Sequence, residues 1–177
     1  MFEWIALAVV VLASASVVYF TLRLGISPMP SNRAQSEAIL VAIAETPGPI
    51  YELGAGWGTL AFALADRFPH APVVAFELSW VPWAVMRLRQ AARPRKNLTL
   101  RRENFLTVSL SGAKVLVSYL FPKGMEALAR RLERESTGAR LVTHTFAVRG
   151  WTPEREQTLD DLYRTHVYVY RITGAGK

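Results

Sequence analysis

The residues best suited to chemistry form a glycine-rich loop between a predicted strand, Ile50–Leu53, and a predicted helix that begins at Thr59. The loop reads Gly54-Ala55-Gly56-Trp57-Gly58. Glycines at such a turn let the backbone bend tightly and approach a ligand closely. The whole loop is therefore a candidate cofactor-binding site. The alternative is a strand-to-helix turn with a structural role alone.

The spacing of the glycines separates two classes of nucleotide-binding loop. Nicotinamide and flavin enzymes carry Gly-x-Gly-x-x-Gly, which would require a third glycine where Thr59 stands. A strand followed by Gly-x-Gly-x-Gly is the loop of class I methyltransferases, which use S-adenosylmethionine (SAM). The spacing therefore favours SAM over a dinucleotide.

Five further residues extend the predicted cofactor site: Glu52, Glu77, Leu78, Asn104 and Phe105. Glu52, at the end of the first strand, can hold the amino acid end of SAM directly or through water. Glu77, which closes the second strand and precedes Leu78, suits a pair of ribose hydroxyls. Asn104 and Phe105 follow the third strand, where an amide can bond the adenine amino group and a ring can pack on the base. Solvated strand ends and a plain turn are the alternatives.

Strands and helices must alternate to bring these residues together. Strands are predicted at Ile50–Leu53, Val73–Glu77, Leu98–Arg102, Val115–Leu120, Leu141–Phe146 and His166–Ile172. A helix capped by Ser31 or Asn32 is predicted to run to about Ala44, with Ala34, Ile39, Leu40 and Ile43 on its buried face. Three further helices are predicted, at Thr59–Phe68, Val81–Ala92 and Met125–Glu135. The helix Val81–Ala92 has an apolar pattern of its own. In it, Val81, Ala84, Val85 and Leu88 have the spacing of a buried helix face. This alternation predicts an α/β fold, Rossmann-like and doubly wound, with a mostly parallel sheet.

The N-terminal segment, Trp4–Leu22, is 19 residues without a charged side chain, about the length of a membrane-spanning helix. A cleaved signal peptide is the alternative, but Met1-Phe2-Glu3 lacks the positive charge that a signal peptide carries before its apolar core. We therefore expect a transmembrane helix within an anchor at residues 1–26. A Pro-rich linker and lead-in helix would follow at 27–46, and a SAM-binding domain at 47–177. Arg23 and Arg33 follow the span, which predicts a catalytic domain on the cytoplasmic side.

Four motifs make the interpretation more specific. They are Pro28-Met29-Pro30-Ser31, Glu52-Leu53-Gly54-Ala55-Gly56-Trp57-Gly58, Phe76-Glu77-Leu78 with Pro82-Trp83, and Phe121-Pro122 with Gly150-Trp151-Thr152-Pro153. Together they resemble the small membrane-anchored class I SAM-dependent protein-lysine methyltransferases, whose members modify the ATP synthase c-subunit and the ADP/ATP translocase. The resemblance covers the anchor and roughly Pro28 to Arg171. It implies a SAM-dependent N-methyltransferase that acts on a lysine of a membrane protein.

A lysine nucleophile must be neutral before it can accept a methyl group. Desolvation in an apolar, aromatic slot lowers the pKa of its ammonium. Tyr119, Phe121 and Pro122, at the end of the fourth predicted strand, are the candidate catalytic residues that form this slot, and Trp151 is expected at its mouth. The alternative is that these aromatic residues only pack the edge of the sheet.

Charge and composition bound the partners. The formal net charge is +7, and a basic stretch runs through Arg87, Arg89, Arg93, Arg95, Lys96, Arg101 and Arg102. Beside a membrane anchor, this stretch predicts an anionic lipid surface as partner, with a solvated face as the alternative. There is no nucleic-acid reader motif. The chain has no cysteine, and its three histidines lack metal-ligand spacing, so no metal is expected.

Two other functions remain open at this point. A SAM-dependent enzyme with the same site could methylate a lipid or quinone head group. A catalytically inactive, membrane-tethered binding module is the third possibility, because Trp57 stands where the family usually has Asp.

Overall fold

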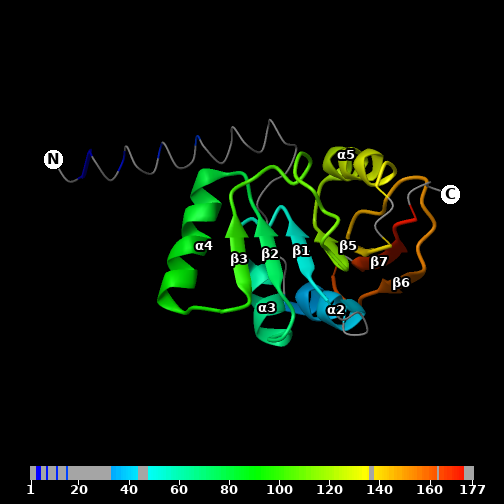
Figure 1. Cartoon of the computed structure of the whole chain (residues 1–177), viewed down its shortest axis with the longest axis horizontal. Helices are drawn as coiled ribbons and strands as arrows, with labels where there is room; N and C mark the ends of the chain where they lie inside the picture. Colours follow the sequence, from blue (N-terminus) through cyan, green and yellow to red (C-terminus); the bar gives the residue numbers. More distant parts are fainter. Residues whose placement is uncertain are drawn as a thin grey trace.

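The described residues form a seven-stranded β-sheet in which β1 to β5 run parallel and β7 runs antiparallel to both of its neighbours (Figure 1). The computed structural model describes residues 3–4, 7, 11, 15, 33–43, 48–135, 138–162 and 164–173. The strands are β1 (Ile50–Leu53), β2 (Val73–Phe76), β3 (Leu98–Arg101), β4 (Val115–Ser118), β5 (Arg140–His144), β6 (Arg155–Thr158) and β7 (His166–Arg171). Their order across the sheet is β3-β2-β1-β4-β5-β7-β6.

The direction of this order reverses beside β1. The chain moves outward from β1 to β2 and β3, then crosses back to place β4 on the other side of β1. Ligands of open parallel sheets bind at such a reversal, outside the carboxyl ends of the strands. Leu53 pairs with both Phe76 and Ser118, and Ser118 pairs with Thr143. The residues that directly follow β1 to β5 therefore share one edge of the sheet, which we call the carboxyl edge.

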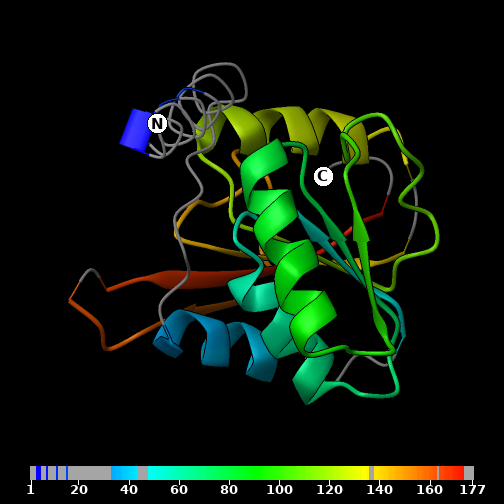
Figure 2. The ribbon, with the colours of Figure 1, turned by 90° about the vertical axis from the view of Figure 1, so that its left-hand side faces the viewer.

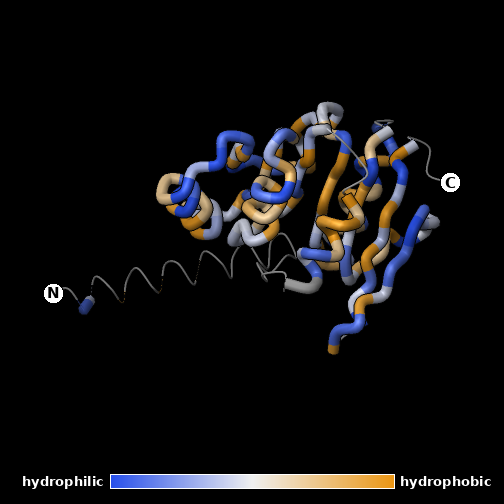
Figure 3. The backbone as a smooth tube through the Cα atoms, turned by 90° about the horizontal axis from the view of Figure 1, so that it is seen from below, coloured by the Kyte–Doolittle hydropathy of each residue, from blue (hydrophilic) through white to orange (hydrophobic). Residues whose placement is uncertain are grey.

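Helices cover both faces of the sheet. They are α2 (Arg33–Ile43), α3 (Thr59–Arg67), α4 (Trp80–Ala92) and α5 (Pro122–Leu132). Apolar side chains of α2, α3 and α4 share one buried cluster with Val73, Val115 and Val117. Those of α5 share a second cluster with Leu53 and Leu116 of the opposite face. Figure 2 shows α5 separated from α2 and α3, and Figure 3 shows the apolar strands inside and the hydrophilic β6 outside.

The predicted alternation and mostly parallel sheet are present, and the differences lie at the ends of elements. Helix α5 begins at Pro122 rather than at Met125, because proline is well suited to the first turn of a helix. Strand β6 was not predicted. All four of its residues are exposed, so it lacks the apolar alternation that marks a strand in sequence.

One prediction about packing is wrong. Ala84 and Leu88 do not lie on the buried face of α4, and the Leu88 side chain is 72% exposed. The buried residues of this helix are Pro82 and Met86. Met86 faces the cluster shared with α3, so the helix is rotated relative to the stripe that the spacing suggested.

Several predictions about the N-terminal segment lie outside the described residues. They include most of the predicted span Trp4–Leu22, the linker around Pro28, and the helix cap at Ser31 or Asn32. No helix within the described part of the chain is long and apolar enough to cross a membrane. The predicted domain boundaries accordingly remain predictions. Further along, α2 buries Ile39, Leu40 and Ile43, as its pattern predicted.

Candidate functional site

All three glycines of the loop have a backbone conformation that favours glycine. Their φ angles are 81° at Gly54, 55° at Gly56 and 79° at Gly58, in the left-handed region that side chains rarely adopt. A Cβ on Gly58 would lie 2.6 Å from Cγ of Met86. A Cβ on Gly54 would lie 3.2 Å from Cδ2 of Leu120. The buried side chains of Met86 and Leu120 therefore pack directly against the backbone of the loop.

Backbone hydrogen bonds tie the loop to the neighbouring strand. The N–H groups of Gly54 and Ala55 both donate to the carbonyl of Phe76, at 2.9 and 2.8 Å. The N–H of Gly58 donates to the carbonyl of Ala55 at 2.8 Å, which closes a tight turn before α3. The loop is thus fixed against β2 at the carboxyl edge.

Glu77 links the loop to the start of α4. Its Oε2 accepts a hydrogen bond from the N–H of Gly56 at 2.8 Å, and its Oε1 accepts one from the N–H of Ser79 at 2.7 Å. The residue is only 8% exposed. Each carboxylate oxygen has a second lone pair, so this oriented group keeps the capacity to accept bonds from a diol. Leu78, its half-buried neighbour, accepts a bond from Arg102 through its carbonyl.

Glu52 is a buried carboxyl two residues before the first glycine of the loop. It is buried, and no described residue supplies a hydrogen-bond partner to its Oε2. Burial, assisted by the negative charge of Glu77, raises the pKa of its carboxyl from 4.5 to about 8. A buried carboxyl without a partner is costly unless something satisfies it. The amino acid end of SAM carries an ammonium that could donate a hydrogen bond to this carboxyl. The buried acceptor at Glu52 therefore fits SAM.

Phe105 joins the same region, whereas Asn104 has a local role. The Cε1 atom of Phe105 lies 4.0 Å from the Cβ position of Gly54, and its side chain belongs to the core on the α5 face. Oδ1 of Asn104 accepts a bond from the N–H of Leu106 at 2.9 Å, which caps the turn after β3. The turn that the sequence left open as an alternative is therefore present, and it places Phe105 against the loop.

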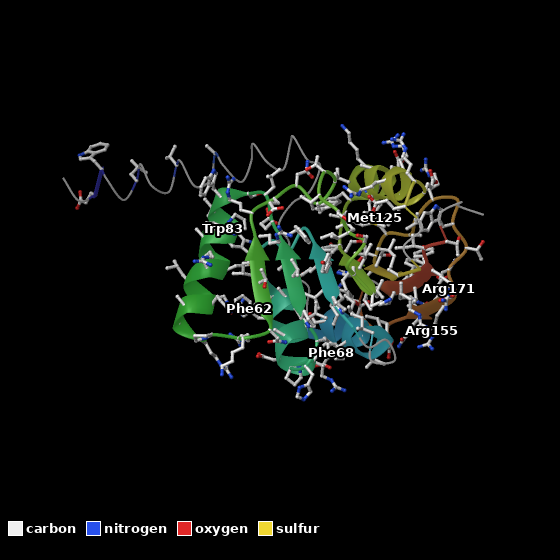
Figure 4. The ribbon with its side chains drawn as sticks, viewed as in Figure 1. Phe62, Phe68, Trp83, Met125, Arg155 and Arg171 are labelled. Atoms are coloured by element: carbon white, nitrogen blue, oxygen red, sulfur yellow. The ribbon has the colours of Figure 1, made fainter. Side chains whose placement is uncertain are left out.

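An aromatic cluster occupies the carboxyl ends of β4 and β5. Tyr119 stacks on His144 with ring centroids 4.1 Å apart, and Phe146 lies 6.3 Å from Tyr119 and 5.6 Å from Phe121. Burial lowers the pKa of His144 to about 4, so its ring is neutral near pH 7. Met125 of α5 lies beside the cluster (Figure 4), and its sulfur accepts a hydrogen bond from the Ser118 hydroxyl at 3.6 Å.

Sequence reasoning missed two members of this cluster, His144 and Phe146. They lie 25 or more residues from Tyr119, and only strand pairing brings them close. Ser118 pairs with Thr143, so the next residue on each strand, Tyr119 and His144, must be neighbours. Predicting the adjacency of β4 and β5 would have been enough to find this pair.

The remaining predicted residues are more dispersed. Trp151 packs edge-on against Tyr170, with centroids 6.0 Å apart, and its Nε1 donates to Glu133 at 3.5 Å. Tyr170 pairs with Leu141 near the start of β5, so these contacts place Trp151 away from the carboxyl edge. Pro122 begins α5, directly after the aromatic cluster. Trp57, half-buried in the glycine loop, accepts a bond from Arg89 through its carbonyl at 3.4 Å.

Known proteins resemble this chain in sequence. The family described as "ANTKMT methyltransferase domain" matches residues 52–155. A protein-lysine N-methyltransferase of Saccharolobus islandicus (strain REY15A) is 32% identical over 131 residues, which cover 70% of this chain and 78% of that protein. The adenine nucleotide translocase lysine N-methyltransferase of Mus musculus is 28% identical, over 75% of this chain and 58% of its own length. The Mus musculus lysine N-methyltransferase of the ATP synthase c-subunit is 25% identical, over 71% and 51%. The chain thus spans little more than half of each mouse protein.

The fold also resembles solved structures. An RNA methyltransferase from Salinibacter ruber, in complex with S-adenosyl-L-homocysteine (SAH), superposes with a TM-score of 0.70. The match is 23% identical and covers 82% of this chain and 94% of that one. At this identity the likeness concerns the fold alone, and it confirms the predicted Rossmann-like, class I methyltransferase architecture.

Proposed function

Because the chain belongs to the ANTKMT methyltransferase family, a family of SAM-dependent enzymes, we propose that it methylates a lysine side chain of a membrane protein. The match to the family extends over residues 52–155, which include the glycine loop, Glu77 and the aromatic cluster. Two relatives are named for the methylation of the adenine nucleotide translocase and of the ATP synthase c-subunit, both membrane proteins. These names support a substrate of the same class.

One observation carries the proposal most directly: the glycine loop and the aromatic cluster lie at the carboxyl ends of adjacent strands. The loop follows β1, and the cluster follows β4 and β5. Group transfer requires the two reactants to be held side by side, which can account for several kcal/mol of the barrier. A donor site and an acceptor slot on neighbouring strands satisfy this requirement.

The residues at the carboxyl edge would divide the work between binding and desolvation. Bound SAM supplies an activated methyl group on a sulfonium. Glu77 and the loop backbone would hold its ribose region, and Glu52 its charged amino acid end. Phe105 would offer an apolar wall. On the acceptor side, Tyr119, Phe121 and Phe146 would exclude water from the lysine and favour its neutral amine.

We further propose that the enzyme works at a membrane, anchored by its N-terminal segment with the catalytic domain on the cytoplasmic side. The uncharged run Trp4–Leu22 and the basic residues that follow it support this location. An anionic lipid surface is the proposed partner of the basic stretch between Arg87 and Arg102.

The function is tested by labelling. The full chain is incubated with methyl-deuterated SAM and membranes from cells that lack the protein, and labelled lysines are located by mass spectrometry. We expect label in a membrane protein with the natural chain and none with Glu77→Ala. Circular dichroism verifies that the variant is folded. Label confined to the lipid extract would contradict lysine methylation and favour a lipid or quinone acceptor. A folded, SAH-binding chain that labels nothing would contradict the enzyme proposal itself.

A further inference from the structure

Helix α4 exposes a face that is unusual for a helix packed on a sheet. Only Pro82 and Met86 are buried among its residues. Trp80 and Leu88 are 55% and 72% exposed, although both are large and apolar. Figure 2 shows α4 turned toward the viewer, with none of the other described helices in front of it.

The exposed apolar residues form one stripe. Trp80, Ala84, Leu88 and Ala91 follow one another at intervals of four, four and three residues, which places them on one side of a helix. All four are exposed. We call this set the α4 stripe. It is about 16 Å long at 1.5 Å per residue.

Arginines flank the α4 stripe, and acids are absent from this part of the sequence. Residues 80–102 contain seven Lys or Arg and no Asp or Glu. The guanidinium of Arg102 lies over the ring of Trp80, 3.7 Å from its centroid, and that of Arg87 lies 5.8 Å from the ring centroid of Trp83. One cation therefore lies on the tryptophan that begins the stripe, and a second lies on the half-buried Trp83 of the same helix.

Two other basic residues of this region already have acidic partners. Arg95 forms a bidentate pair with Asp66 at 2.9 Å, and Arg101 pairs with Glu103 at 3.0 Å. Arg87 and Arg102 lie instead on tryptophan rings. A guanidinium has five N–H donors, so Arg102, which donates one to the carbonyl of Leu78, has others that can reach a phosphate oxygen. Arg87 and Arg102 can therefore meet an external anion without giving up either of those two ion pairs.

We propose that the α4 stripe, with Arg87 and Arg102, is a docking surface that lies in the head-group region of an anionic lipid bilayer. Tryptophan prefers this region, because its ring is apolar and its N–H is polar. An apolar stripe bordered by arginines is the pattern of helices that lie in the interface rather than span it. A second copy of the chain suits the surface less well, because a symmetric contact would bring the arginines of both copies together.

The position of the stripe gives this contact a consequence for catalysis. Trp80 stands three residues after Glu77, and Arg102 directly follows β3, so both lie at the carboxyl edge. A bilayer that contacts them would face the same edge as the glycine loop and the aromatic cluster. The inference rests on the proposed function in one respect: this orientation is useful only if the acceptor lysine lies close to the membrane surface.

The test uses the full chain in lipid nanodiscs whose acyl chains carry bromine, which quenches nearby tryptophan fluorescence. Neutral phosphatidylcholine discs are compared with discs that contain phosphatidylglycerol. Subtracting the quenching of Trp80→Phe from that of the natural chain isolates the signal of Trp80, whatever the other tryptophans contribute. We expect this signal to be quenched in anionic discs and much less in neutral ones.

Two variants probe the rest of the surface. We expect Leu88→Ser and Arg87→Gln each to weaken the quenching of Trp80 in anionic discs. For Arg87→Gln, the equilibrium constant for contact of this surface with the bilayer should fall about fivefold, since one cation is lost. Leu162→Ser is the matched control, since Leu162 is 89% exposed in the turn region between β6 and β7. It should leave the quenching unchanged.

Three outcomes would overturn the proposal. The first is an unquenched Trp80 in anionic discs, and the second is equal quenching in neutral and anionic discs. The third is shielding of Trp80 from the bromine that increases with protein concentration, as expected for self-association. SAH affinity, measured on the same samples, reports on the cofactor site independently. Loss of lysine labelling with intact quenching would contradict the proposed function and leave the docking surface standing.

Discussion

Replacing Glu52 by glutamine should change how the stability of the fold depends on pH. In the folded chain the pKa of Glu52 is about 8, because burial and the charge of Glu77 disfavour its ionised form. In the unfolded chain the pKa returns to about 4.5. Between these values the unfolded chain loses the proton and the folded chain keeps it. Raising the pH through this window therefore favours unfolding.

The size of the effect follows from the shift in pKa. One pKa unit corresponds to about 1.4 kcal/mol, so this group lowers the free energy of unfolding by about 1.4 kcal/mol for each pH unit inside the window. Between pH 5.5 and pH 7.5 the loss is about 2.5 kcal/mol once the rounded ends of the titration are included. Glutamine has a similar shape and does not titrate, so Glu52→Gln should lack this loss.

The assay is urea unfolding of the full chain in mild detergent, followed by tryptophan fluorescence at several pH values. The natural chain should lose stability relative to Glu52→Gln as the pH rises, and the two curves should become parallel above about pH 8. Glu37→Gln, at an exposed position of α2, is the matched control and should follow the natural chain. Parallel curves for the natural chain and Glu52→Gln from pH 5.5 to 7.5 would refute the reasoning.

Three further expectations concern the loop, its support and its ligand. Gly58→Ala should lower the free energy of unfolding by about 2 kcal/mol or more in urea melts, because alanine disfavours the left-handed region and its Cβ would lie 2.6 Å from Met86. Ala63→Gly, in the helix that follows, is the control and should cost only about 1 kcal/mol. Asn97→Ala should cost about 2 kcal/mol, since its Nδ2 donates to the carbonyls of three residues that end α3 and its turn; an unchanged urea midpoint would contradict this. In calorimetric titrations, the affinity for SAH should rise about 15-fold from pH 6.5 to pH 8, because Glu52 loses its proton and can then pair with the ammonium of the ligand. If Glu52→Gln shows the same dependence of affinity on pH, another group is responsible for it.

The local parts of the cofactor site were predictable from sequence, because their chemistry depends on neighbouring residues. The glycine spacing predicted the loop, and at Gly58 both the left-handed backbone and the 2.6 Å approach to Met86 disfavour a side chain. The acid after the second strand, Glu77, proved to be oriented by that loop through Gly56. In each case a strand end and a few adjacent residues define the geometry, so the pattern in the chain carries most of the information.

The parts that depend on packing between distant segments were not predictable in this way. The spacing of Val81, Ala84, Val85 and Leu88 suggested a buried face, but Met86 packs against the glycine loop instead and turns Leu88 outward. His144 and Phe146 reach Tyr119 only through the pairing of β4 with β5. Strand β6 consists of exposed polar residues, and its pairing with β7 alone defines it. Periodicity identifies which helix faces are apolar, but not which of them the fold buries.

The orientation of α4 links the cofactor loop to the proposed docking surface. On its inner side, Met86 lies where a side chain on Gly58 would have to go, and Glu77 bonds both Gly56 and Ser79, the residue before the helix. Its outer side carries the apolar stripe that we assign to the bilayer. One rigid helix therefore contacts the cofactor loop on one side and the docking surface on the other. Because a packed helix moves as a unit, seating its outer face at the membrane would also set the distance of the glycine loop from the lipid surface. A lysine at that depth would be the one the enzyme can reach.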